Sequence, residues 1–183
     1  MRMGTIIDDF LRFCKTGIPP RVLLLSFVLL CVFIAVGICS KRVKRKRLYV
    51  LICVFIEYVL LVVGSTVIFR FTMPFHRVEL MPFWDLYAIC TGVPGVHVWD
   101  IILNISLFVP LGIMLSFNQN NRWYVVMVCA ILLSVTIETL QFVFFKGIAQ
   151  TDDVINNTIG AILGYSLNKK IHNIAIRHEQ NRK

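Results

Sequence analysis

Charged residues are scarce in this chain of 183 residues. They make up 16% of the sequence, against roughly 25% in a typical soluble domain, and only 10 residues are acidic. Glycine and proline are also sparse, at 10 and 6 residues, and no low-complexity tract is present, which excludes a collagen-like or disordered chain. Hydrophobic residues instead reach 57% and occur in blocks of about twenty, the length of a membrane-spanning helix. The composition predicts an all-α polytopic membrane helix bundle.

Motifs for metal binding, redox chemistry or hydrolysis are also missing. The 6 cysteines include no C-x-x-C pair, and the sequence has no H-E-x-x-H, no G-x-S-x-G and no phosphate-binding glycine loop. A metal site built from His76, Glu79, Asp85 or His97 is conceivable, but the spacing of these residues is not diagnostic. We therefore predict no metal and no cofactor.

The apolar blocks predict about five transmembrane helices, the last of them short. They cover residues 22–40, 48–69, 98–117, 123–145 and 153–167. The transmembrane domain is expected over residues 22–168. Residues 1–21 form a leader, which either lies on the membrane surface as an amphipathic helix or has no such role. Residues 169–183 form a basic cytoplasmic tail.

Lysine and arginine predict the orientation of this bundle. Six of the 19 basic residues lie in the run Lys41–Arg47, between the first two apolar blocks, and five lie in the C-terminal tail. If this run is cytoplasmic, twelve basic residues lie inside and seven outside, so the positive-inside rule places the N-terminus outside and the C-terminus inside. No aromatic residues are interleaved with these charges as a base-stacking surface would need, so nucleic acid is not an expected partner.

Polar residues inside the apolar blocks point to a site. In three separate helices they recur at helical spacing, so that each set shares one face, namely Asp100 with Asn104, Ser134 with Glu138 and Gln141, and Asp153 with Asn157. At about 1.5 Å per residue, Asn104, Glu138 and Asn157 each lie roughly 9–10 Å below the outer surface. Because a charge in hydrocarbon is costly, such residues normally face a bundle interior or a wet cavity. The pattern predicts a polar cleft open to the outside.

Structural alternatives exist for most of these residues. Asp152 and Asp100 stand at predicted helix starts and can act as N-caps. The amides Asn104, Gln141 and Asn157 can hydrogen-bond between helices. Glu138 is harder to explain structurally, because it stands away from the helix ends. Glu57, in the second helix, has no obvious companion and is expected to be a protonated interior glutamate.

Small residues predict one close helix contact. Gly160 and Gly164 form a G-x-x-x-G motif and continue the stripe that begins with Asp153 and Asn157. Glycines at this spacing let two helix backbones approach closely. The stripe therefore predicts that the fifth helix packs against a neighbour.

Four segments together resemble the VanZ-like family in order and spacing, over roughly residues 48–165. These segments are Glu79-Leu80-Met81-Pro82-Phe83, the stretch containing Asn104, Phe108, Pro110 and Gly112, the face of Ser134, Glu138 and Gln141, and the run from Asp152 to Tyr165. Two positions depart from the family pattern, since the family often has asparagine at Glu79 and arginine at Lys146. Lysine keeps the charge of arginine but loses its fork geometry.

The resemblance implies a multi-pass protein of the bacterial cell membrane, related to proteins associated with teicoplanin-type glycopeptide resistance. The family name describes a phenotype and implies no reaction. The expected partners are membrane lipids, a lipid-linked cell-wall intermediate or a lipoglycopeptide; nothing in the sequence predicts an oligomeric state.

Three functions fit these residues. In the first, Glu79, Asp100, Asn104, Glu138, Gln141, Asp153 and Asn157 bind a lipid head group or cell-wall component, which the concentration of amides and the missing nucleophile–base pair favour. In the second, an intramembrane enzyme acts on a lipid-linked substrate with Glu138 and Asp153 as the acid–base pair. The third, a proton-coupled transporter, ranks last because no inverted repeat is evident.

Overall fold

The computed structural model describes residues 18–40, 44–94, 96, 98–117, 120 and 122–180. Most of the predicted leader, with Cys14, lies outside the described residues, as do His97 and the start of the basic run at 41–43. The described chain divides into two compact units, one running to Phe75 with the addition of Val143–Gly147, and the other holding His76–Phe142 and Ile148–Lys183. We describe each unit by itself.

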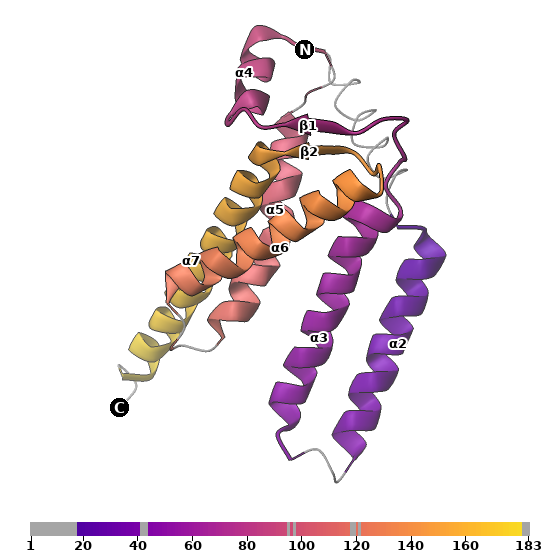
Figure 1. Ribbon diagram of the computed structural model, residues 1–183. Helices are drawn as coiled ribbons and strands as arrows, with labels where there is room; N and C mark the ends of the chain where they lie inside the picture. Colours follow the sequence, from indigo (N-terminus) through magenta and orange to yellow (C-terminus); the bar gives the residue numbers. More distant parts are fainter. Residues whose placement is uncertain are drawn as a thin grey trace. The chain divides into compact units, whose positions relative to one another are not determined.

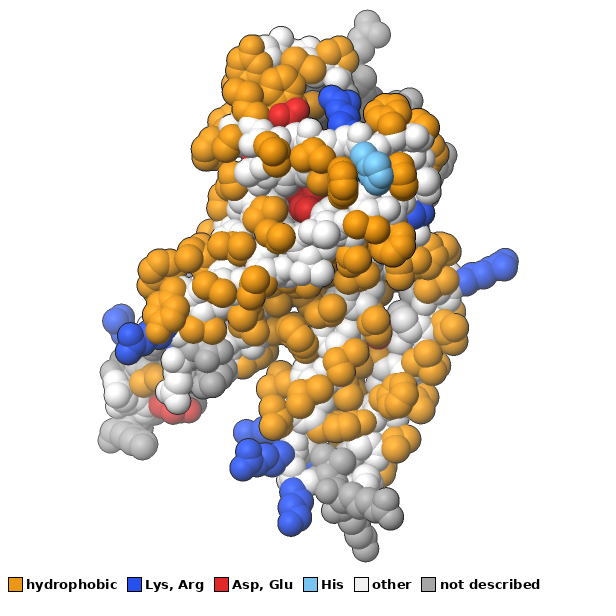
Figure 2. Space-filling model, viewed as in Figure 1, with side chains coloured by type: hydrophobic (Ala, Val, Ile, Leu, Met, Phe, Trp, Pro, Cys, Tyr) orange, Lys and Arg blue, Asp and Glu red, His pale blue; other side chains and the backbone are white. Residues whose placement is uncertain are grey.

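The first unit is built on a helical hairpin. Helix α2 (Pro20–Cys39) begins with proline in its first turn, where the missing N–H is no loss, and packs on α3 (Lys46–Val63), which continues into the π-helical turn η1 (Gly64–Ile68) (Figure 1). The Tyr49 ring lies on Gly37, and its hydroxyl donates to the carbonyl of Phe33 at 2.9 Å. Hydrophobic side chains cover these helices, and basic side chains gather where α3 begins (Figure 2).

The second unit contains three short elements that the sequence patterns do not reveal. Strand β1 (Arg77–Glu79) pairs in parallel with β2 (Ile148–Gln150), with Val78 opposite Ala149. Helix α4 (Trp84–Thr91) follows β1, in the segment between the second and third predicted transmembrane helices. The strand pair therefore brings the start of this unit to its last helix.

Three longer helices complete the second unit, namely α5 (Val98–Ser116), α6 (Trp123–Val143) and α7 (Thr151–Gln180). Helices α5 and α7 pack along each other extensively (Figure 1). A Cβ atom at Gly160 would collide with the carbonyl oxygen of Ile105, and one at Gly164 with that of Val109. The close helix contact predicted from the G-x-x-x-G motif is thereby confirmed, with α5 as the partner.

The predicted all-α membrane fold is also confirmed. Four helical stretches among the described residues are long and apolar enough to cross a membrane, Pro20–Cys39, Lys46–Ile68, Val98–Ser116 and Trp123–Val143. The fifth predicted helix is present as the first half of α7, but α7 continues to Gln180 and is too polar over its length to belong to this set. Part of the predicted basic tail is therefore helical.

Candidate functional site

The second unit buries a set of polar side chains, a kind of residue that is usually exposed in soluble proteins. Each member is less than a tenth exposed, and the set comprises Asp85, Ser116, Ser134, Glu138, Gln141, Asp152, Asp153 and Asn157. Buried polar groups are costly unless they are hydrogen-bonded. The hydrogen-bond partners of each side chain therefore show whether it holds the fold together or faces a space that a ligand could enter.

Asp152 ties the start of α7 to the start of α4. One carboxylate oxygen accepts from the backbone N–H of Phe83 at 2.5 Å and the other from that of Asp85 at 2.7 Å. These donors are among the amides that a helix N-terminus leaves without intrahelical partners. The prediction that Asp152 caps its own helix is wrong, because Thr151 already begins α7 and both Asp152 oxygens serve α4.

The backbone conformation of Phe83 explains why the start of α4 needs these two hydrogen bonds. Its backbone is left-handed, with φ of 62°, a conformation that bulky residues rarely adopt. A strained residue persists only where its surroundings fix it. The bond from Phe83 to Asp152 holds the turn that leads into α4, although these residues lie 69 positions apart in the chain.

Two hydrogen bonds connect the long helices. Asn104 on α5 donates its side-chain amide to Asp153 on α7 at 2.5 Å, and Asn157 on α7 donates to the hydroxyl of Ser134 on α6 at 2.8 Å. The structural alternative considered for Asn104 and Asn157, hydrogen bonding between helices, therefore describes their contacts. Asn157 Oδ1 accepts no bond from the part of the chain that the structure describes.

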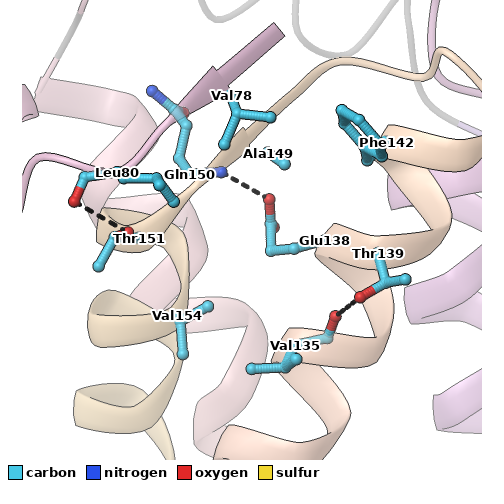
Figure 3. A pocket seen from close by; sticks show the side chains of 10 residues that line it. All are labelled: Val78, Leu80, Val135, Glu138, Thr139, Phe142, Ala149, Gln150, Thr151 and Val154. Atoms are coloured by element: carbon cyan, nitrogen blue, oxygen red, sulfur yellow. Dashed lines mark hydrogen bonds between the residues drawn. The ribbon is translucent and has the colours of Figure 1, made fainter. Parts of the chain in front are cut away.

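Glu138 is placed differently from these bonded pairs. Its carboxylate accepts the backbone N–H of Gln150 at 2.9 Å, so α6 is joined to β2 just before α7 begins. The same side chain lies in the wall of a pocket of about 310 Å³ (Figure 3). The lining residues come from β1 and the residue that follows it, and from α6, β2 and α7. They are Val78, Leu80, Val135, Glu138, Thr139, Phe142, Ala149, Gln150, Thr151 and Val154. The pocket is mainly apolar, with few polar groups.

The other predicted site residues lie away from this pocket lining. Asp100 is exposed near the start of α5, and Glu79 at the end of β1 is half-buried, with Oε1 accepting from the Met81 amide at 3.3 Å. Gln141 is buried on α6. Of the seven predicted binding residues, the structure brings Asn104 to Asp153 and places Glu138 in a pocket. Asp153 is not among the residues that line this pocket with Glu138.

Asp85 is a buried carboxyl group that sequence reasoning named only as a conceivable metal ligand. Burial raises its pKa above the ordinary 3.8, and the negative charges of three neighbours raise it further, those of Asp152, Asp100 and Glu79. Among the described residues, no group of three or more His, Cys, Asp or Glu side chains is arranged to hold a metal ion. Asp85 is buried because it lies on α4. This helix has only 8 residues, too few to give a clear periodic pattern in the sequence.

Lys146, in the first unit, forms local bonds. Its ammonium group donates to the carbonyl of Arg70 at 3.2 Å and to the Thr72 hydroxyl at 3.0 Å. The adjacent chain is held by a bond from the Met73 amide to the Phe145 carbonyl at 2.7 Å. A compact ammonium group suits these separate acceptors without the fork geometry of arginine.

Comparison with known proteins agrees with the motif resemblance. The VanZ/LLP1 family model matches residues 48–172, which is more than half of the chain. The chain is 32% identical over 85 residues to Protein VanZ of Enterococcus faecium, and the match covers 46% of this chain and 50% of that protein. This chain thus spans about half the length of that relative. No solved structure matches the chain. The apolar helices, the motifs and the family match together place this membrane protein in the VanZ/LLP1 family.

Proposed function

We propose that this protein is a multi-pass protein of the bacterial cell membrane and binds a cell-envelope lipid or cell-wall component in the pocket beside Glu138. The pocket itself carries the proposal. Its volume of about 310 Å³ is at the lower end of the range for small-molecule sites, and its mainly apolar walls with few polar groups are typical of such sites. A pocket of this size receives part of a lipid, with the remainder outside.

The position of the pocket along α6 supports a ligand from the membrane. Its lining residues on α6 run from Val135 to Phe142, close to the end of that helix at Val143. At about 1.5 Å per residue, this part of α6 lies within roughly 12 Å of the helix end, at the depth of head groups and upper acyl chains. In the orientation predicted by the basic residues, this end of α6 is the outer one.

The family gives the proposal a biological context. VanZ-like proteins are associated with teicoplanin-type glycopeptide resistance, and the lipid-linked precursors of the cell wall reside in the same membrane. We infer that occupancy of the pocket changes how the envelope responds to such an antibiotic. Candidate ligands are a phospholipid, a lipid-linked cell-wall intermediate and the acyl tail of a lipoglycopeptide.

Paired substitutions test binding against catalysis. Glu138→Gln removes the charge from the pocket wall, and Asp153→Asn removes the charge of the Asn104 partner while an amide oxygen still accepts that bond. In a glycopeptide-susceptible bacterium, we expect wild-type protein and Asp153→Asn to reduce teicoplanin susceptibility and Glu138→Gln to lose the effect. Membrane abundance of each tagged variant is measured alongside.

The two outcomes that contradict the binding proposal are distinct. Full activity of Glu138→Gln at normal abundance would show that the pocket carboxylate has no part in the function. Loss of activity in both variants at normal abundance would favour the alternative of an intramembrane enzyme with Glu138 and Asp153 as its acid–base pair.

A further inference from the structure

Exposed apolar side chains gather around the start of α4. Each of the large hydrophobic residues there is more than half exposed, namely Leu80, Met81, Phe83, Leu86 and Tyr87. Hydrophobic side chains also cover α4 in the space-filling view (Figure 2). A contiguous exposed apolar surface marks a contact with lipid or with another protein. The arrangement of α4 and its neighbours favours lipid.

Helix α4 turns its charge inward and its apolar side chains outward. Residues 80–94, all within the described part of the chain, contain one charged side chain, that of Asp85. Asp85 is 4% exposed, and Ala88, three residues later on the same face, is fully buried. Leu86 and Tyr87 lie on the opposite face and are exposed. A helix that faces water has the reverse arrangement, with its polar side chains outside.

The start of α4 lies at one end of the membrane-spanning helix α5. Asp152 accepts the backbone amides of Phe83 and Asp85, and the next residue, Asp153, accepts the side-chain amide of Asn104 on α5. Asn104 stands roughly 9 Å from the first residue of α5. Because α5 is long and apolar enough to cross a membrane, its first turns lie near the membrane surface. The hydrogen bonds therefore hold the start of α4 beside that surface.

The length of α4 places it at the membrane boundary. Its 8 residues span about 12 Å, too little to cross a hydrocarbon core of about 30 Å. The ring centroids of Trp84 and Tyr87 lie 5.6 Å apart, and these two residue types are enriched at membrane–water interfaces. Figure 1 shows α4 leading away from β1 and from the long helices, so its start lies nearer the bilayer than its end.

The apolar surface also continues into the pocket beside Glu138. Leu80 lines that pocket and is 73% exposed at the beginning of the apolar run. Other lining residues of the pocket, among them Val135, belong to the membrane-spanning helix α6. Lipid that surrounds α6 therefore lies next to the surface at the start of α4.

We propose that residues 80–87 form an interfacial segment that inserts into the lipid leaflet at the start of α5. The side chains of Leu80, Met81, Phe83 and Leu86 contact the upper acyl chains, and Tyr87 lies among the head groups. In the orientation predicted from the basic residues, this is the outer leaflet. The inference goes beyond the proposed function, because it assigns a lipid contact outside the pocket and does not require the pocket to hold a ligand.

A fluorescent probe at Leu86 tests this contact. The full-length protein, with its native cysteines replaced by serine, carries Leu86→Cys labelled with the polarity-sensitive dye NBD, in nanodiscs of phosphatidylethanolamine and phosphatidylglycerol. A phospholipid with a nitroxide high on its acyl chain reports lipid contact, and aqueous iodide reports contact with water. We expect the nitroxide lipid to quench this probe strongly and iodide to quench it weakly.

Two matched positions calibrate the probe. Ile102→Cys lies at an exposed apolar position in the second turn of α5, and should be quenched by the nitroxide lipid to the same extent as Leu86→Cys. Glu179→Cys lies at an exposed position near the end of α7, and should be quenched by iodide. Met81→Cys gives a second reading from the turn before α4, so the inference stays testable if Leu86→Cys does not fold.

Each outcome decides the inference. Quenching by iodide at Leu86 or Met81, to the level of Glu179→Cys, would show that the segment faces water and would overturn the proposal. Protection from both quenchers would also overturn it, since a protein surface and not lipid would then cover α4. Either failure leaves ligand binding in the pocket intact, because Leu86 and Met81 do not line the pocket.

Discussion

Carboxylates in this protein have different roles because each contacts a different group. Asp152 accepts two backbone amides, Asp153 accepts a side-chain amide, and Glu138 joins a backbone amide to a pocket. The sequence identified Asp153 and Glu138 as inward-facing from their spacing. It could not identify the partners of Asp152, because those partners lie 67 and 69 residues away.

Replacement of Asp152 by asparagine should destabilise α4. Asparagine offers one carbonyl oxygen, and its NH₂ group would face the second backbone N–H, so one buried donor loses its acceptor. We expect a loss of about 1–3 kcal/mol, measured by thermal unfolding in detergent and by faster proteolysis within α4. Glu179→Gln, at an exposed position near the end of α7, is the control. Equal stability of Asp152→Asn and wild type would show that the hydrogen bonds to Asp152 do not stabilise α4.

Asp85 should make stability depend on pH. Its pKa is raised in the folded protein above the ordinary 3.8, so the folded state binds the proton more tightly than the unfolded state. The favourable contribution is complete below pH 3.8 and is lost as the pH rises through the raised pKa. The melting temperature of the wild type should therefore fall as the pH is raised from 4 through this window. In Asp85→Asn, which has no carboxyl group at this position, the melting temperature should fall less. An identical decline in both proteins would show that Asp85 is not its source.

At the scale of elements, the contact between α5 and α7 depends on residues without side chains. Gly160 and Gly164 lie against backbone carbonyls of Ile105 and Val109, and Gly112 on α5 lies in the same way against Ala161 on α7. The first two glycines share a motif that is visible in the sequence. The third lies on the partner helix, so its place in the contact requires the three-dimensional packing.

Gly160→Leu should force these helices apart. Its Cβ alone would meet the Ile105 carbonyl oxygen, so we expect a loss of about 1–3 kcal/mol and less folded protein in the membrane. Ser166→Leu, a small-to-large change on the exposed side of the same helix, is the matched control. Thermal stability and fluorescence-detected size exclusion compare the two. A Gly160→Leu protein as stable as Ser166→Leu would contradict the packing.

The elements differ in how well the sequence predicts them. The apolar blocks at 22–40, 98–117 and 123–145 match α2, α5 and α6 to within about two residues, because a membrane span has a fixed minimum length. The end of α7 was missed, since hydropathy marks the end of an apolar block and not the end of a helix. The strands β1 and β2 have three residues each, too few for a periodic pattern.

The candidate site was predictable only in part for the same reason. Helical spacing identified Glu138 on α6, but the pocket around it also requires Val78 and Leu80 from one chain segment and Ala149 and Gln150 from another. Their proximity follows from the parallel pairing of β1 with β2. No local pattern in the sequence contains that pairing.

At the scale of the whole molecule, topology in the membrane remains a prediction from the basic residues. Cys90 on α4 is exposed and belongs to the loop region expected outside the cell. In a protein with no other cysteine, Cys90 should react with an impermeant maleimide on intact spheroplasts, whereas Lys44→Cys in a Cys90→Ser background should react only after lysis. The reverse pattern would overturn the orientation and place the pocket on the inner side.

The most direct test of the account blocks the pocket without changing its charge. Val135 and Val128 both lie on α6 with exposed fractions of 47% and 48%, but only Val135 lines the pocket. Native mass spectrometry of wild type, Val128→Trp and Val135→Trp, purified in the same detergent, measures the lipid that each retains. We predict that wild type and Val128→Trp retain the same bound lipid and that Val135→Trp, with an unchanged melting temperature, loses it. Retention of that lipid by a folded Val135→Trp protein would contradict binding in the pocket.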